Sequence, residues 1–146
     1  MTTDLAIRDL QARLTAIAVP AKKAWWEKYM KGVIPFRGVG MPDIRSTLAV
    51  WRSDHGLDRY PPTAQLPFAL ALLAEPVAEE KLAGILYLQN YLQDQLPWPE
   101  LLRHYERVFT AAQIFDWNTC DWFCVRVLGP TLVREGQPFA AALSAW

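Results

Sequence analysis

Apolar residues recur along this chain at spacings of three and four, which predicts helices. No segment alternates apolar and polar residues as a half-buried strand would. The first predicted helix begins near Asp4, with Thr3 as its N-cap, and stops at Pro20. The other predicted helices cover residues 21–31, 41–55, 66–75, 78–95, 99–113, 116–128 and 138–146.

Proline and glycine separate these helices. The stretch VIPFRGVG (33–40) is predicted to be a loop, and Pro42 then occupies one of the first positions of the next helix. Gly56 has the place of a C′ residue after His55, and DRYPPT (58–63) forms the next loop. The pair Gly129-Pro130 is predicted to halt the helix that precedes it.

Helices of this length, joined by short proline-rich breaks, are expected to pair antiparallel. Pairs that recur about every 40 residues are typical of helical repeats. The sequence therefore predicts an all-α fold, a right-handed stack of antiparallel helical hairpins forming an α-solenoid, as a single domain over residues 1–146. An irregular helical bundle is the alternative, because the repeats share little sequence identity.

Composition limits the classes of function. The chain has 146 residues and is 52% hydrophobic, which is enough for one domain with its own core. Fifteen basic residues balance fifteen acidic ones, so only a local basic patch could attract nucleic acid. Charges interrupt the first 14 residues and no apolar run is long enough to span a membrane, so we expect a cytoplasmic protein.

Two cysteines, Cys120 and Cys124, lie one helical turn apart, where a disulfide has poor geometry. We expect both to be free, small, buried hydrophobic residues. A zinc site would need two more ligands, and His55 and His104 lie far away in the sequence. The sequence therefore predicts no metal site and no cofactor.

The segment FDWNTCDWF (115–123) holds two carboxylates of different character. Asp116 has the position of an N-cap for the helix that follows. Asp121 lies inside that helix, four residues after Trp117, so the two side chains share one helix face. A solvated surface aspartate is one interpretation of Asp121. The aromatic residues around it favour a functional carboxylate instead.

Basic and aromatic residues alternate in WWEKYMKGVIPFRGVGMPDIR (25–45). Tyr29 ends a predicted helix, and Lys31 and Arg37 follow it around the glycine-containing loop. Such residues can bind phosphates, although a solvated basic rim would look the same. The seven tryptophans are mostly explained by packing between helices.

Three blocks carry a resemblance to a known family: WEKYMKGVIPFRGVGMPDIR, then EEKLAGILYLQNYL, then FDWNTCDWFCVRVLGPTLV. In order and spacing they resemble the N-terminal part of the AlkD family of DNA alkylation repair proteins, which are HEAT-like repeat DNA glycosylases. The resemblance implies an α-α superhelix of the HEAT-like or ARM type. The first block would then form the rim of a concave surface that binds DNA.

The resemblance also implies a reaction, the hydrolysis of the N-glycosidic bond at cationic N3- and N7-alkylated purines in duplex DNA. Asp121 matches the family's catalytic aspartate, which stabilises an oxocarbenium-like sugar or directs water to it. Trp117 matches the tryptophan one turn before that aspartate, and Tyr29 matches a tyrosine in the same cleft. Family members often have a second aromatic residue where this chain has Asp116.

Length is where this chain departs from the resemblance. Family members continue through more helical pairs, which supply an arginine, a further tryptophan and much of the basic surface. This chain ends at AALSAW, which we expect to lie partway through a helix and to expose an apolar face that favours self-association. Two functions therefore stay open: an alkylpurine DNA glycosylase, or a non-catalytic helical-repeat module that binds DNA structures or a protein partner.

Overall fold

The computed structural model describes residues 2–146, and every regular element in this range is helical. In chain order these are α1 (Thr3–Ala16), α2 (Pro20–Tyr29), α3 (Met41–Asp54), η1 (Leu57–Arg59), α4 (Pro62–Ala74), α5 (Ala78–Tyr87), η2 (Leu88–Leu92), α6 (Trp98–Thr110), α7 (Trp117–Phe123), η3 (Cys124–Leu128), α8 (Gly129–Glu135) and α9 (Gln137–Leu143). The segment η1 is a 3₁₀ turn, whereas η2 and η3 are π-helical. The all-α class predicted from the sequence is confirmed.

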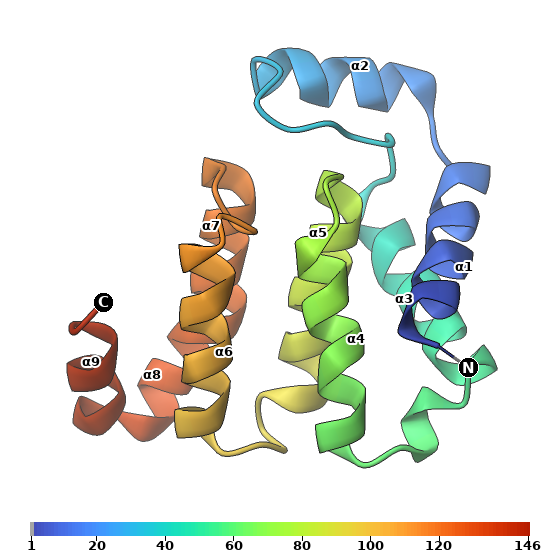
Figure 1. The fold of residues 1–146 in the computed structure, drawn as a ribbon. Helices are drawn as coiled ribbons and strands as arrows, with labels where there is room; N and C mark the ends of the chain where they lie inside the picture. The colour runs from blue at the N-terminus through green and yellow to red at the C-terminus, as the bar shows by residue number, and fades with distance from the viewer. Residues whose placement is uncertain (1) are drawn as a thin grey trace.

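The helices of the stack stand side by side as antiparallel pairs, α1 with α3, α4 with α5, and α6 with α7 (Figure 1). The stack is continuous because α5 packs against α3 on one side and against α7 on the other. Helices α8 and α9 follow at the end of the row. This arrangement is the predicted α-solenoid. None of the helices in residues 2–146 combines the length and the apolar character needed to cross a membrane.

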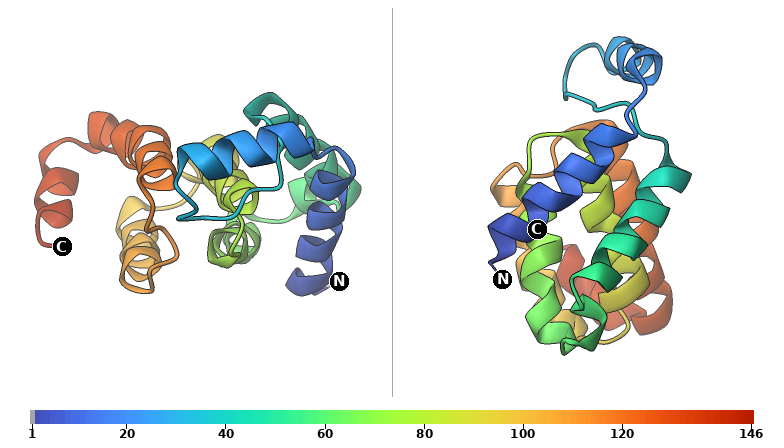
Figure 2. Two further views of the ribbon diagram at one scale, coloured as in Figure 1. Left: turned by 90° about the horizontal axis from the view of Figure 1, so that it is seen from above. Right: turned by 90° about the vertical axis from the view of Figure 1, so that its right-hand side faces the viewer.

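Helix α2 is set apart from the stack. It lies across one end of the pairs, as both Figure 1 and Figure 2 show, and none of its ten residues is buried. The chain enters α3, α5 and α7 at this same end, so their first turns lie next to α2 and the loop that follows it. Residues far apart in the sequence therefore meet here.

Most buried apolar residues form one core that runs along the stack. Its largest fully buried side chains are Trp51, Tyr87, Tyr105 and Phe123. A small second cluster, made of Met30, Ile34, Phe36 and Ala78, lies beneath α2 with Trp26 packed against it. Helix α2 is thus attached to the solenoid mainly through the loop that follows it.

Several helix ends differ from the prediction. The N-cap of α1 is Thr2, whose hydroxyl accepts a hydrogen bond from the Leu5 amide at 3.4 Å, so the helix begins one residue before the predicted start. Helix α4 begins at Pro62, inside the predicted loop, because a proline in the first turn costs no intrahelical hydrogen bond. Helix α9 ends at Leu143 rather than continuing to the last residue.

The prediction that Gly129-Pro130 halts a helix is wrong. The helix continues from α7 through η3 into α8. Pro130 has no amide hydrogen for the Arg126 carbonyl, and the side-chain amide of Gln93 donates to that carbonyl instead, at 3.3 Å. Gly129 leaves room beside the Cys124 carbonyl, which would lie 3.1 Å from an added Cβ. The π-helical turn and Gln93 together carry the chain past the proline.

Candidate functional site

Helix α7 begins at an aspartate cap, as the sequence predicts. Asp116 is buried, and its carboxylate accepts hydrogen bonds from the Thr119 amide at 2.9 Å and from the Thr119 hydroxyl at 2.5 Å. This cap directs Trp117 outward, with 56% of its surface exposed. Asp121, one turn later on α7, is also exposed. Trp117 and Asp121 therefore both reach solvent next to one another on this helix.

The end of α2 brings Tyr29 to Trp117. Their ring centroids are 5.7 Å apart and the planes meet edge to face at 72°. Trp25 lies one turn earlier on α2 and stacks on Tyr29, with centroids 5.1 Å apart and planes within 9°. More than half of the surface of each ring residue is exposed. We call Trp25, Tyr29 and Trp117 the aromatic surface.

Trp25 is not among the site residues predicted from the sequence. Its spacing of four from Tyr29 was a usable signal, since residues at that spacing are neighbours on a helix. The contact between Tyr29 and Trp117 had no comparable signal, because it depends on how α2 lies across the solenoid.

Asp121 lines a shallow hollow of about 190 Å³ with Trp122, Val125 and Arg126. The Arg126 guanidinium lies over the Trp122 ring, 4.9 Å from its centroid. Within residues 2–146 the Asp121 carboxylate accepts no hydrogen bond and forms no ion pair, so no residue in this range occupies its oxygens. Such a carboxylate is available to a cationic or proton-donating ligand.

Several lysines lie in α2 and directly after it, in the segment that also contains Trp25 and Tyr29. Lys22, Lys28 and Lys31 are exposed and form no ion pair with residues 2–146. Lys23 is engaged, because its ammonium donates to Glu27 at 2.7 Å and to the Phe36 carbonyl at 2.6 Å. Lys31 has a positive φ of 54°, which is uncommon for a residue with a side chain. Lys22 and Lys28 of α2, and Lys31 just after it, are thus basic side chains that no acidic residue in this range neutralises.

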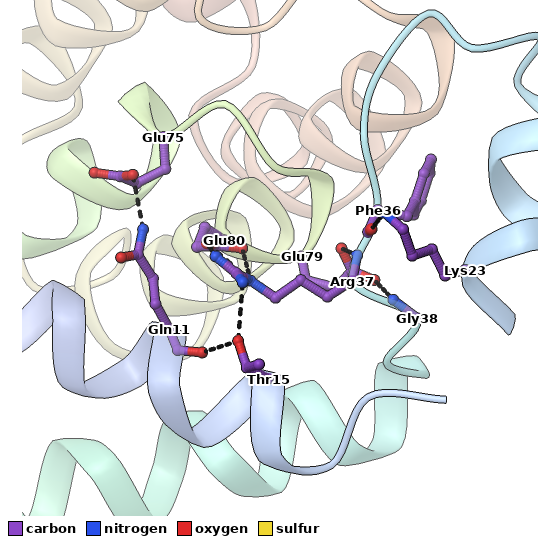
Figure 3. A network of polar contacts seen from close by, with 9 residues as sticks. All are labelled: Gln11, Thr15, Lys23, Phe36, Arg37, Gly38, Glu75, Glu79 and Glu80. Atoms are coloured by element: carbon purple, nitrogen blue, oxygen red, sulfur yellow. Dashed lines mark hydrogen bonds and ion pairs between the residues drawn. The ribbon is translucent and has the colours of Figure 1, made fainter. Parts of the chain in front are cut away.

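Unlike these lysines, Arg37 points its side chain into the protein, toward Glu80 and Thr15 (Figure 3). Its Nε donates to both carboxylate oxygens of Glu80 at 3.1 Å, its Nη2 also pairs with Glu80, and its Nη1 donates to the Thr15 hydroxyl at 2.9 Å. Glu80 is fully buried, and its hydrogen bond to Arg37 raises the pKa of the guanidinium. The expected phosphate contact at Arg37 is therefore replaced by an internal ion pair.

Glu79, beside Glu80, holds the loop between α2 and α3. Its buried carboxylate accepts hydrogen bonds from the backbone amides of Arg37 at 2.9 Å, Gly38 at 2.8 Å and Val39 at 3.1 Å. Gly38 has φ of 99°, and a Cβ there would lie 2.4 Å from the Val19 carbonyl oxygen. Only glycine fits this position, and the loop in turn fixes where α2 ends.

Lys81 holds the loop before α7 in the same way that Glu79 holds the loop after α2. Its buried ammonium donates to the Leu73 carbonyl at 2.8 Å and to the Gln113 carbonyl at 2.6 Å. Burial lowers the pKa of Lys81. The consecutive residues Glu79, Glu80 and Lys81 thus connect the loops that carry the two sides of the aromatic surface. Three charged residues in the first turn of a helix look like an ordinary solvated helix start, which is why the sequence did not reveal this role.

Cys120 and Cys124 are free, as the sequence predicts, but they are not both buried. Both are free, but Cys124 is exposed and Cys120 half-buried, so the expectation that both are buried is wrong. Partial burial and the neighbouring Cys120 raise the pKa of the Cys124 thiol. Among residues 2–146 no three metal-binding side chains lie close enough together to hold a metal ion.

An α-solenoid of antiparallel helix pairs belongs to the class of helical-repeat proteins. The family model of the DNA alkylation repair enzymes matches residues 10–146. The chain belongs to this family. The comparison with curated proteins and the comparison with solved structures each give no significant match.

Proposed function

We propose that this protein is a DNA glycosylase that hydrolyses the N-glycosidic bond of cationic N3- or N7-alkylated purines in duplex DNA. The observation that carries the proposal is the pair of exposed residues Trp117 and Asp121, one turn apart on α7, with Tyr29 of α2 in contact with Trp117. Membership of the DNA alkylation repair enzymes supports DNA as the partner.

The chemistry asks little of the protein, because alkylation already makes the base a good leaving group. When the bond from C1′ to the base nitrogen breaks, its electron pair neutralises the positive base and leaves a cationic, oxocarbenium-like sugar. The carboxylate of Asp121 stabilises that cation by charge. A water oxygen then bonds to C1′, and the proton that it loses passes to Asp121 or to solvent.

The aromatic rings and lysines of this end of the protein suit the cationic base, the sugar and the phosphates of the substrate. The exposed faces of Tyr29 and Trp117 attract a cationic base or the cationic sugar through their ring electrons. Lys28 and Lys31, exposed at the end of α2, can bind backbone phosphates on the same side. Binding would then orient the sugar toward the carboxylate without a deep base pocket.

The deciding experiment measures free N7-methylguanine released from methylated duplex DNA by the native protein and by Asp121→Asn. Removing the carboxylate should lower the release rate by about 10²-fold or more. Asp58→Asn removes another exposed carboxylate and should leave the rate unchanged. Equal release by native protein and Asp121→Asn would overturn the role of Asp121.

A second function is favoured by a different observation. Acidic and basic residues balance at fifteen each, and Arg37 is committed to Glu80 rather than to a phosphate. These facts suit a non-catalytic module that binds DNA structures or a protein partner. Tight binding of methylated duplex without any base release, by the native protein, would favour this function.

We also propose self-association through the end of the solenoid formed by α8, α9 and the last residue. Leu132, Val133 and Trp146 are exposed there, Val133 by 87%. Exposed apolar side chains favour contact with a second copy. Sedimentation equilibrium should show dimers at high concentration, and Val133→Glu should remove them. A monomer at all concentrations would contradict this proposal.

A further inference from the structure

A cavity of about 130 Å³ lies where the first turns of α3, α5 and α7 meet beneath α2. Its walls include the rings of Trp26, Phe36 and Trp122, and the side chains of Leu82, Glu79 and Asn118. Trp26 and Phe36 are stacked, with centroids 5.6 Å apart and planes within 14°. Flat apolar walls of this kind suit a flat ring.

Asn118 supplies the polar group of this cavity. Only 7% of its surface is exposed, and its side-chain amide makes no hydrogen bond to any residue in the range 2–146. Its oxygen and nitrogen are not among the side-chain atoms that are sealed from solvent without a partner, so a molecule in the cavity can reach them. An amide offers one acceptor and two donor hydrogens side by side, so its natural partner has a donor next to an acceptor.

Glu79 restricts the charge of the occupant. Its carboxylate already accepts three backbone amides, so it has a negative charge at the wall and no need of a further donor. The Lys22 ammonium lies 3.5 Å from where a Cβ of Gly40, another wall residue, would be, so the walls carry charges of both signs. A neutral ring is the occupant that neither charge repels.

The size of the cavity restricts the occupant further. A cavity of about 150 Å³ in another protein holds one benzene ring. A single six-membered ring therefore fits here, and a fused double ring would have to extend outside.

We propose that this cavity binds one neutral pyrimidine base, whose adjacent donor and acceptor pair with the amide of Asn118. Trp122 is a wall both of this cavity and of the hollow that contains Asp121. A bound base would thus be separated from that carboxylate by one indole ring. The inference goes beyond the proposed hydrolysis, because binding of a base here does not need Asp121.

Saturation-transfer NMR titrations with free uracil, and with benzene as a ring without polar edges, test the site directly. Uracil should bind the native protein, and Asn118→Leu should weaken uracil binding about tenfold while leaving benzene binding unchanged. Asn90→Leu, at an exposed asparagine, is the matched control and should change neither titration. Absence of uracil binding, or equal uracil binding by Asn118→Leu, would overturn the proposal.

A second variant keeps the test valid if Asn118→Leu fails to fold. Met41 lines the cavity at the first position of α3, and Met41→Phe puts an aromatic ring, which is bulkier than the methionine side chain, into that space. Circular dichroism should show an intact fold, and uracil should no longer bind. Uracil binding that persists in Met41→Phe would place the ligand outside this cavity.

Two further arms identify the source of the base and separate this proposal from the proposed function. An oligothymidylate that displaces uracil would show that the cavity accepts a base within a strand, and failure to displace it would assign the site to free bases. Asp121→Asn should bind uracil normally. Uracil binding by a protein that releases no methylated base would support this inference while the proposed hydrolysis fails.

Discussion

The ring of Tyr29 meets the ring of Trp117 edge to face, with 5.7 Å between their centroids, although one residue ends α2 and the other begins α7. This contact joins a helix that buries none of its residues to the solenoid on which Asp121 lies. It forms one side of the proposed DNA surface. Its stability therefore decides how firmly α2 is placed over the site.

A double-mutant cycle measures that contact. Tyr29→Leu and Trp117→Leu should each destabilise the protein slightly, and the two changes together should be less damaging than their sum. Exposed aromatic pairs contribute about 0.5 kcal/mol or more beyond their buried area. Urea unfolding of the four proteins gives the coupling free energy. Strictly additive effects would mean that the two rings do not interact in solution.

Lys31 and Ala112 provide a matched pair for testing the basic patch. They have φ values of 54° and 53°, and each follows the end of a helix, α2 or α6, where glycine is usual. The left-handed conformation costs a non-glycine residue about 1–2 kcal/mol, and greater freedom of glycine in the unfolded chain offsets part of this. Lys31→Gly and Ala112→Gly should therefore each raise the free energy of unfolding by about 0.5 kcal/mol.

The same two variants should differ in DNA binding. Lys31→Gly removes a charge beside Tyr29, so it should lower affinity for duplex DNA and reduce the salt dependence by about one phosphate contact. Ala112→Gly should leave both unchanged. Fluorescence anisotropy at several salt concentrations measures both quantities. Equal affinities for the two variants would exclude Lys31 from the DNA surface.

Because Arg37 and Glu80 form a buried ion pair, removing one partner should destabilise the protein more than removing both. Arg37→Met leaves a fully buried carboxylate without its partner and should cost about 3 kcal/mol or more. Replacing both residues, as Arg37→Met with Glu80→Leu, should recover most of that loss, because the uncompensated charge is gone. Guanidinium unfolding midpoints compare the three proteins. A double variant as unstable as Arg37→Met would contradict this role for the pair.

Burial of Tyr105 should make the stability of the protein depend on pH. Its hydroxyl is buried without a hydrogen-bond partner among residues 2–146, and burial raises its pKa above the ordinary value. Because the folded-state pKa is the higher one, the unfolded chain loses its proton first, and stability falls as the pH rises above about 10. Tyr87 adds to this fall, since burial raises its pKa to about 12.

Tyr105→Phe should therefore act in two ways. At pH 7 it removes an unpaired buried hydroxyl and should stabilise the protein by about 1 kcal/mol. Above pH 10 the advantage should grow by up to about 1.4 kcal/mol per pH unit, because one titrating group is gone. Thermal or urea unfolding between pH 7 and 11 measures both effects. A constant difference across this range would contradict the raised pKa.

Much of the fold followed from local signals in the sequence. Helical spacing, the aspartate cap at Asp116 and the glycine at Gly56 are properties of neighbouring residues, and the structure confirms each of them. The prediction failed at Gly129-Pro130, where a distant side chain, Gln93, satisfies the carbonyl that the proline leaves free. Local signals could not include that partner.

Spacing along the chain was enough to predict the helices, their antiparallel order and the helix face that Trp117 and Asp121 share. The contact between Tyr29 and Trp117, the inward turn of Arg37 and the burial of Glu79 and Lys81 arise only when the helices pack together. Each of these depends on residues that are distant in the chain. A charged side chain needs such a partner only after folding has removed it from water. An unpaired charge in the protein interior costs too much free energy to persist.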